Sequence, residues 1–293
     1  AGGGRAARYL PEVTAVLDAS DRSYTISQST SLEHARHVAA AAARRGETVV
    51  AFGGDGLTGA LAGAVGAGSL GIIPAGQGND FARALEIPFR PAAAARVLLD
   101  GRTRVVDLIA VTQAGETQVA PVIATGSVYI GIASVAAEIA NRTRFVQGPL
   151  LYNLAALRAL LGWKPTRFRI DAIGGDGQQT TDEFSGYAVV VANSPYFGAG
   201  MRVAPDAEIG DGLLDVLVMR HATKLAFLRV LTRIKKGSHV ALSQVGMSRA
   251  AAAIVTADRA LPAGADGEIL TVESPWHIRA IPGALNVIVP GPG

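Results

Sequence analysis

Two glycine-rich stretches that contain carboxylates are the parts of this sequence best suited to chemistry. The first is Gly53-Gly54-Asp55-Gly56, and the second runs from Pro74 to Asp80 with the sequence PAGQGND. Glycines leave no side chain between the main chain and a bound anion, and backbone N–H groups at the start of a helix attract phosphate. Asp55 is the one side chain kept among the first glycines. A carboxylate beside bound phosphates indicates Mg²⁺ binding or proton transfer.

Each stretch follows a short apolar run and precedes a helical pattern. Residues 48–52 have the length and β-branched content of a strand, and residues 57–65 have helical periodicity. Residues 70–73 predict a second strand, and Asn79 is expected to cap the helix that begins at Asp80. Loops at the carboxyl ends of neighbouring parallel strands border one crevice. The two stretches therefore predict one shared nucleotide-phosphate site.

A glycine-rich turn between a strand and a helix is also an ordinary tight turn, so the first stretch alone leaves both interpretations open. The same four residues recur at positions 174–177 in a different setting. An alternating pattern at 167–171 precedes them and polar residues 178–182 follow, which predicts a hairpin turn between two half-buried strands. The flanking elements and the second stretch, rather than the tetrapeptide, favour a nucleotide site.

Several familiar signatures are absent from the sequence. No G-x-x-x-x-G-K-[ST] loop occurs, because the first lysine is Lys164, and neither glycine-rich stretch fits the dinucleotide pattern G-x-G-x-x-G. The 27 basic residues are scattered, the net charge is +3 and aromatic residues make up 5%, so nucleic-acid binding is not indicated. There is no cysteine, which excludes disulfides, and no apolar run of about 18 residues that would span a bilayer.

Two acidic turns in the second half are further candidates for chemistry. Residues 205–215, PDAEIGDGLLD, suit Mg²⁺ because they gather hard oxygen ligands, and a solvated acidic turn is the alternative. Asp266-Gly267-Glu268 is by default a hairpin turn, and a carboxylate held there could accept a proton from a substrate hydroxyl. Residues 223–236 predict an amphipathic basic helix, either simply packed on a sheet or also resting on anionic lipid.

The order of predicted elements divides the chain in two. Residues 1–101 alternate helices at 6–17, 32–45 and before Gly101 with strands, including one at 24–27, which is typical of an α/β layered domain. Residues 102–279 are β-rich. A last strand at 284–289 is expected to return to the first domain, so residues 280–293 are assigned to it. In the second half, strands are expected at 103–111, 118–124, 166–173, 186–192, 213–219 and 248–256, and helices at 134–141 and 150–161.

Taken in order, these motifs resemble the diacylglycerol kinase catalytic family, in particular its soluble bacterial members of actinobacterial type. The resemblance covers nearly the whole chain and implies an N-terminal three-layer α/β nucleotide-binding domain similar to phosphofructokinases and NAD kinases, followed by a C-terminal β-sandwich domain. ATP and the lipid headgroup would occupy the cleft between them. The motifs are Gly53–Gly56, residues 73–83, Asp107-Leu108, residues 200–215 and Ala265–Glu268.

The resemblance also implies roles for particular residues. Glu268 would be the general base for the lipid hydroxyl, and Asp55 and Asp80 would lie near the catalytic Mg²⁺ and the phosphates. Contacts with ATP are expected from Ser29, Gly53, Gly54, Asp55, Gly56, Leu57, Thr58, Gly59, Gly78 and Asn79.

A structural Mg²⁺ in this family is held at the Asp-Gly-Leu turn. In this sequence the turn corresponds to the side chain of Asp211 and to the backbone carbonyls of Glu208 and Leu213. Asp107 would join a supporting acidic network.

Three departures from the family pattern are visible. Leu57 replaces the threonine that is usual in the bacterial motif, and leucine is what sphingoid kinases carry there. Gln77 occupies a position that is commonly small or hydroxylated. The family's Asn-Pro segment and its strand, expected before Gly2, do not occur in this sequence, and no signal peptide is visible.

The sequence thus predicts an ATP- and Mg²⁺-dependent lipid kinase whose favoured acceptor is diacylglycerol, giving phosphatidic acid. The alternatives are a sphingoid-base or other lipid kinase, and a non-catalytic nucleotide or lipid sensor. The expected partners are ATP and a lipid acceptor, without nucleic acid. A cytoplasmic protein in transient peripheral contact with the inner membrane surface is expected, and a homodimer is left open.

Overall fold

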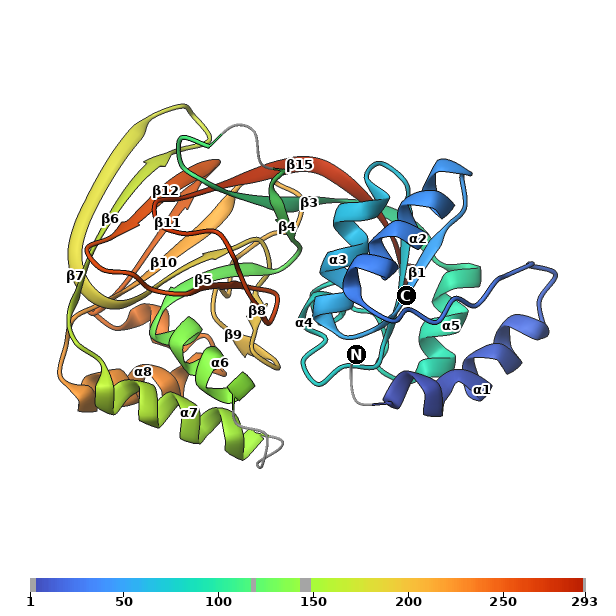
Figure 1. Ribbon diagram of the computed structural model, residues 1–293, viewed down its shortest axis with the longest axis horizontal. Helices are drawn as coiled ribbons and strands as arrows, with labels where there is room; N and C mark the ends of the chain where they lie inside the picture. The colour runs from blue at the N-terminus through green and yellow to red at the C-terminus, as the bar shows by residue number, and fades with distance from the viewer. Residues whose placement is uncertain (1–3, 117–119, 143–148, 292–293) are drawn as a thin grey trace.

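The computed structural model describes residues 4–116, 120–142 and 149–291. Figure 1 shows two layered parts side by side along the long axis of the molecule, and two long strands that run from one part into the other. These strands are β3 (Arg102–Gln113) and β15 (Trp276–Val289), which pair antiparallel with a register shift between Ile281 and Leu285. The two parts are therefore joined through one continuous sheet.

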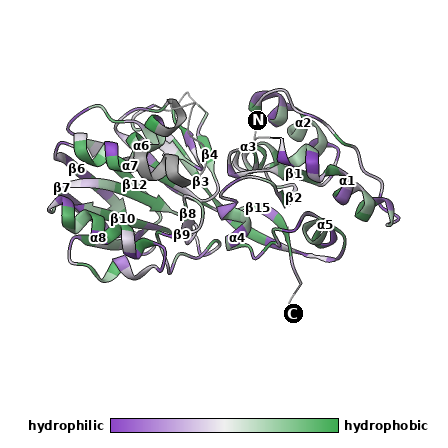
Figure 2. Ribbon diagram, turned by 90° about the horizontal axis from the view of Figure 1, so that it is seen from below, coloured by the Kyte–Doolittle hydropathy of each residue, from purple (hydrophilic) through white to green (hydrophobic). Residues whose placement is uncertain are grey.

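The first part is a mainly parallel sheet, with β3 as its antiparallel strand, between two pairs of helices (Figure 2). β1 pairs in parallel with β2, and β2 pairs in parallel with the end of β15. β2 is buried at five of its six positions, as expected for a parallel strand that is covered on both faces. Helices α2 and α3 pack together, and so do α1 and α5. The elements are α1 (Arg5–Asp18), α2 (Leu32–Arg44), β1 (Val49–Gly53), α3 (Asp55–Val65), β2 (Ser69–Pro74), α4 (Asp80–Ala84) and α5 (Pro91–Asp100).

The second part is a β-sandwich with helices along one side. Side chains alternate along its long strand β7: Val189 and Val191 enter one core cluster, whereas Val190 enters another. The first cluster lies between the β layers, and the second lies between the sheet and the helices. This period-two pattern is what a strand covered on both faces requires.

The strands of the second part, besides β3 and β15, are β4 (Val122–Ala124), β5 (Ser127–Gly131), β6 (Thr166–Ile173), β7 (Gln179–Ala192), β8 (Tyr196–Phe197), β9 (Met201–Arg202), β10 (Leu214–Arg220), β11 (Val245–Ala250), β12 (Ala252–Ala257), β13 (Ala263–Ala265) and β14 (Glu268–Ile269). Its helices are α6 (Ile132–Arg142), α7 (Pro149–Gly162) and α8 (Lys224–Ile234), with a 3₁₀ turn at Ser238–Ala241.

Most of the predicted elements are present, including the hairpin turn at 174–177. There, Gly174 N donates to Gln178 O at 2.8 Å, and β6 pairs antiparallel with β7 from Thr166 to Ile173. The last strand does reach the first part, where Asn286 and Val287 pair with β2. The domain boundaries at 101/102 and 279/280 stay a prediction, since β3 and β15 each run through both parts.

Two predicted strands are wrong or divided. Residues 24–27 form no strand; Tyr24 and Ile26 are exposed, and the Tyr24 hydroxyl donates to Asp18 Oδ1 at 2.6 Å. Their alternation therefore does not reflect a buried sheet face. The single strand expected at 248–256 is two, β11 paired with β10 and β12 paired with β6. Of the strand expected at 118–124, residues 118 and 119 lie outside the described residues, and β4 begins at Val122.

Candidate active site

The two glycine-rich loops touch through their backbones at the carboxyl ends of β1 and β2. Ala75 N donates to Gly53 O at 2.7 Å. A methyl group on Gly76 would lie 2.5 Å from Gly54 Cα, and one on Gly54 would lie 3.0 Å from Gly76 Cα. Only glycine permits this approach, which fixes the start of α3 against the second loop.

Replacing Gly76 with alanine is expected to lower the free energy of unfolding by about 1–3 kcal/mol, because the new methyl group meets backbone atoms that cannot rotate away. Affinity for ATP should fall as well, since the loops are forced apart. Urea unfolding and calorimetric titration with ATP measure both effects. Gly162→Ala is a matched control, because nothing lies within 4 Å of the added methyl. Equal behaviour of the two variants would contradict the close contact.

Asn79 organises the second loop rather than capping the helix that follows. It has φ 52°, in the left-handed region, and its side chain makes no capping hydrogen bond to α4. Instead Asn79 Oδ1 accepts from Gly76 N at 2.8 Å, and Nδ2 donates to Gly76 O at 3.1 Å. Arg5 Nη1 donates to the same carbonyl at 2.7 Å. The predicted cap is wrong because the amide finds better partners within its own loop.

Asp55 and Asp80 both approach Gly78. A methyl group there would be 2.8 Å from Asp55 Oδ2 and 3.3 Å from Asp80 Oδ2. Asp80 accepts from the backbone N–H groups of Ala199 at 2.9 Å and Gly200 at 2.7 Å, which ties α4 to the second part of the molecule. Asp55 begins α3, and Phe81 N donates to its Oδ1 at 3.3 Å.

The electrostatics of this pair favour a cation. Burial raises the pKa of Asp55 from 3.8 to about 6, and the negative charges of Asp80 and Asp266 add to the effect. Burial also raises the pKa of Asp80, although the amides of Ala199 and Gly200 oppose the shift. Carboxylates that repel one another in a low-dielectric setting are stabilised by a divalent ion with oxygen preference.

Asp266 anchors the hairpin between β13 and β14. It accepts from Thr125 N at 2.6 Å, Thr125 Oγ1 at 2.8 Å, Gly126 N at 2.9 Å and Ser127 N at 3.2 Å. Burial raises the pKa of this carboxyl, and the hydrogen bonds oppose the rise. Its Oδ2 would be 2.9 Å from a methyl group on Gly59 in α3. The hairpin expected from Asp-Gly is confirmed, with positive φ at both turn residues.

Glu268, two residues beyond this anchor, lies over the first turn of α3. A methyl group on Gly56 would be 2.9 Å from Glu268 Oε1. The residue is exposed, unlike Asp55 and Asp266. The structure therefore brings together three of the predicted site residues, Asp55, Asp80 and Glu268, from two loops and a hairpin far apart in the sequence. It adds Asp266, which the sequence indicated only as a turn residue.

Three residues expected to contact ATP have other surroundings. Leu57 packs on Gly53 and against the core of the first part. Thr58 is buried and its Oγ1 donates to Gly54 O at 3.2 Å. Ser29 lies in the coil before α2, two residues ahead of Ser31, whose hydroxyl caps that helix. Contact of these residues with ATP stays a prediction.

Comparison with known proteins agrees with this geometry. Residues 1–111 match the diacylglycerol kinase catalytic domain, and residues 126–289 match the YegS C-terminal NAD kinase beta sandwich-like domain. A diacylglycerol kinase of Mycobacterium tuberculosis is 35% identical over 269 residues, which cover 88% of this chain and 82% of that protein. The chain belongs to the diacylglycerol kinase family. It is a lipid kinase.

Other relatives of this lipid kinase extend the comparison. A diacylglycerol kinase of Bacillus subtilis is 27% identical, with 89% of this chain and 84% of that protein covered. A YegS-like lipid kinase of Pseudomonas aeruginosa is 32% identical, with 83% and 76% covered. A crystal structure from Bacillus anthracis has the same fold, with a TM-score of 0.78 and 22% identity over 99% of this chain and 92% of the other.

The acidic turn of the lipid kinase is built around Asp107. Its Oδ2 accepts from Gly212 N at 2.7 Å and its Oδ1 from Gly283 N at 2.8 Å, so it holds the turn against β15. Burial raises the pKa of Asp215 to about 6, with further contributions from Asp206 and Glu208. Asp107 thus holds the acidic turn in place through backbone N–H groups, and its membership of an acidic network stays a prediction.

The predicted structural Mg²⁺ site lies on this same turn. Asp211 Oδ1 accepts from Leu213 N at 2.9 Å, and the carboxylate also pairs with Arg249. The Glu208 carbonyl accepts from Gly210 N at 2.9 Å. Among the described residues, no three His, Asp or Glu side chains are gathered as metal ligands. Arg249 meets part of the negative charge, and Mg²⁺ binding at Glu208, Asp211 and Leu213 stays a prediction.

The structure also shows a cavity that the sequence did not reveal, of about 320 Å³ beside the second loop. Arg5 and Arg83 give it positive charge, and Arg83 lies over the ring of Phe89 at 4.6 Å. Arg83 Nε is buried and, within the described part of the chain, has no hydrogen-bond partner. Two guanidinium groups therefore lie beside the second glycine-rich loop, whereas the first 163 residues contain no lysine.

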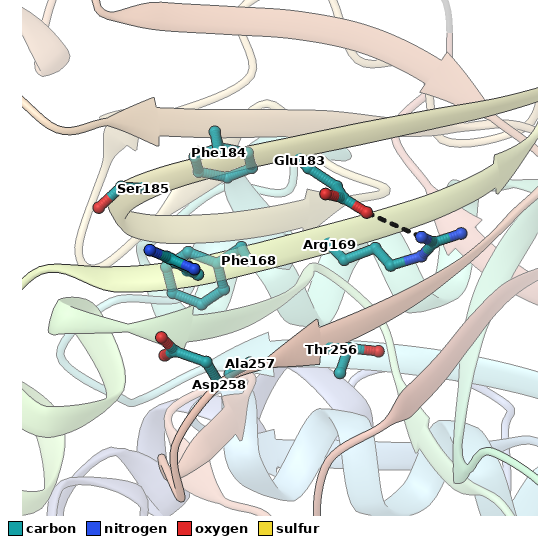
Figure 3. A pocket seen from close by; sticks show the side chains of 9 residues that line it. Phe168, Arg169, Glu183, Phe184, Ser185, Thr256, Ala257 and Asp258 are labelled. Atoms are coloured by element: carbon teal, nitrogen blue, oxygen red, sulfur yellow. Dashed lines mark hydrogen bonds and ion pairs between the residues drawn. The ribbon is translucent and has the colours of Figure 1, made fainter.

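A larger cavity, of about 480 Å³, lies elsewhere, on strands β6, β7 and β12 (Figure 3). Phe168 and Phe184 line it with their rings tilted by 30° and ring centroids 5.5 Å apart, and Arg169 pairs with Glu183 at 2.8 Å. It contains none of the residues predicted for the site. Its size therefore carries no argument for catalysis.

Proposed function

We propose that this lipid kinase transfers the γ-phosphoryl group of ATP to a hydroxyl group of diacylglycerol, producing phosphatidic acid and ADP. The observation that carries the proposal is the convergence of Glu268 on the first turn of α3, beside Asp55. A proton acceptor, a phosphate-binding helix start and a cation-binding carboxylate pair are the parts that phosphoryl transfer needs. The names of two relatives, diacylglycerol kinases at 35% and 27% identity, support diacylglycerol as the acceptor.

Each group of site residues has its own role in the proposed reaction. The backbone N–H groups at the start of α3 and in the second loop face the phosphates, and Arg5 and Arg83 add positive charge. Glu268 accepts the proton of the acceptor hydroxyl while the hydroxyl oxygen bonds to the γ-phosphorus. In the same step the bond between the γ-phosphorus and the β–γ bridging oxygen breaks, and ADP leaves. Asp266 positions Glu268 by holding the hairpin on residues 125–127.

Asp55 and Asp80 fit Mg²⁺, because both are half-buried carboxylates whose ionised forms are disfavoured without a nearby cation. When bound, Mg²⁺ supplies positive charge that stabilises the phosphates during transfer. Asp55 has one oxygen toward Gly78 and the other toward Phe81 N. A cation there would return the pKa of Asp55 toward its usual range, because an opposite charge favours the ionised form.

The experiment that tests the proposal measures labelled phosphate transfer from ATP to a panel of dispersed lipids, with and without Mg²⁺. Diacylglycerol, ceramide and a sphingoid base are the acceptors. Labelled phosphatidic acid, dependent on Mg²⁺, is the expected product. Labelling of another lipid instead would retain the chemistry and refute the acceptor. ATP binding without labelling of any lipid would refute transfer and favour a nucleotide sensor.

A further inference from the structure

Large apolar side chains are exposed together on two helices of the second part. Leu157 and Leu161 on α7 are 46% and 65% exposed, and Leu225 and Leu228 on α8 are 75% and 40% exposed. The spacings i,i+4 and i,i+3 place each pair on one side of its helix. The other large hydrophobic residues that are exposed among the described ones, such as Ile26 and Val105, lie outside these two helices.

Both helices cover the same face of the sandwich. Ala159 and Leu160 of α7 and Phe227 and Val230 of α8 are buried in one core cluster with Leu217 of the sheet. Figure 1 shows both helices along the lower edge of the second part. Lys224 Nζ, at the start of α8, donates to Leu161 O near the end of α7 at 3.2 Å. The two helices therefore lie side by side, and the surface that carries their exposed leucines is here called the α7–α8 face.

The charged residues that α7, α8 and their flanking segments contribute are all basic. All four lysines of the chain lie on or beside these helices, at 164, 224, 235 and 236. Arg158, Arg229 and Arg233 are exposed on the helices themselves. No Asp or Glu occurs between Glu138 and Asp171, or between Asp215 and Asp258. Exposed leucines rimmed by cations, without acids, match the boundary between acyl chains and anionic headgroups.

We propose that the α7–α8 face docks on the surface of an anionic phospholipid bilayer, with its leucines among the acyl chains and its lysines and arginines at the phosphates. The inference rests on the proposed function, because the acceptor resides in a bilayer. α6 packs against α7 and against β13 and β14, which carry the Glu268 hairpin. Docking therefore places the membrane one helix away from the proposed proton acceptor. None of the helices described is both long and apolar enough to cross a membrane.

The test compares the wild-type chain with the double variant Leu161→Asp/Leu225→Asp in sedimentation with vesicles. One vesicle set is phosphatidylcholine, and the other contains 30 mol% phosphatidylglycerol in phosphatidylcholine. Wild type is expected to bind the anionic vesicles, less strongly at high salt, and the double variant at least about tenfold less. Ile26→Asp is the matched control, since it adds a charge at another exposed apolar residue, and should bind like wild type.

Kinase assays separate docking from chemistry. The double variant should lose about tenfold or more in phosphorylation of long-chain diacylglycerol in vesicles, yet match wild type on a water-soluble short-chain diacylglycerol. The docking proposal would be overturned if the double variant bound anionic vesicles as well as wild type does. It would also be overturned if wild type bound no vesicles and the double substitution only dissociated a dimer. Selective loss of vesicle binding in a chain that phosphorylates neither acceptor would leave docking supported and refute the proposed function.

Discussion

Replacing Glu268 with glutamine is expected to lower turnover by about 10²–10⁴-fold, because the amide cannot accept the proton of the acceptor hydroxyl. The change keeps the size of the side chain, and Glu268 is exposed at the end of a hairpin that Asp266 anchors. ATP affinity and the free energy of unfolding should therefore stay close to those of wild type. Steady-state phosphate transfer and calorimetric titration with ATP measure the two quantities.

Glu273→Gln is the matched control, because Glu273 is also exposed and lies near the same hairpin in the sequence. Its turnover should equal that of wild type. If Glu268→Gln keeps wild-type turnover, Glu268 is not the base, and Asp55, the next carboxylate at the start of α3, takes its place. If ATP binding falls together with turnover, Glu268 acts in nucleotide binding instead.

Replacing Asp55 with asparagine should abolish phosphate transfer and, at the same time, stabilise the protein in the absence of ligands. Its pKa is raised from 3.8 to about 6, so the folded state holds a proton there that the unfolded state releases. Stability is consequently lost as pH rises from about 4 to about 6 and stays lower above that. The shift of about two pH units corresponds to a cost on the order of 3 kcal/mol at pH 7, and asparagine removes it.

Urea unfolding at pH 4 and at pH 7 tests whether the ionised Asp55 carboxylate lowers the free energy of unfolding. The difference in unfolding free energy between Asp55→Asn and wild type should be larger at pH 7 than at pH 4, where wild-type Asp55 is mostly protonated. Asp21→Asn is the control, since Asp21 is exposed in the coil after α1. Saturating Mg²⁺ with ATP should stabilise wild type much more than the variant. If Asp55→Asn were less stable than wild type at pH 7, the ionised Asp55 carboxylate would not destabilise the folded protein, and the prediction would be wrong.

Local patterns were sufficient to predict the loops and most elements of this lipid kinase. Glycine-rich stretches between strand and helix patterns located Gly53–Gly56 and the second loop, and Asp-Gly located the hairpin before Glu268. Each of these depends on residues close together in the sequence. The resemblance to a family then ordered them into one site, and the structure confirms that Asp55, Asp80 and Glu268 meet.

Long-range contacts could not be predicted in the same way. Asn79 precedes a helical pattern and is a residue type that often caps helices. Its side chain instead hydrogen-bonds to the backbone of Gly76, because the second loop closes on itself. Asp266 reads as a turn residue, and its partners are 139 to 141 positions away in the chain. The close approach of Gly54 and Gly76 depends on the pairing of β1 with β2. Tertiary packing decides each of these cases.

The two long strands that join the parts also limit how such kinases can recombine. The chain enters the second part along β3 and leaves it along β15, whose last residues pair with β2 of the first part. The match to the C-terminal family domain, residues 126–289, includes that strand. A chimera that exchanges only this segment between relatives would import a foreign strand into the sheet of the first part. Functional exchange therefore has to move the first 111 residues and the final strand together, as a discontinuous unit.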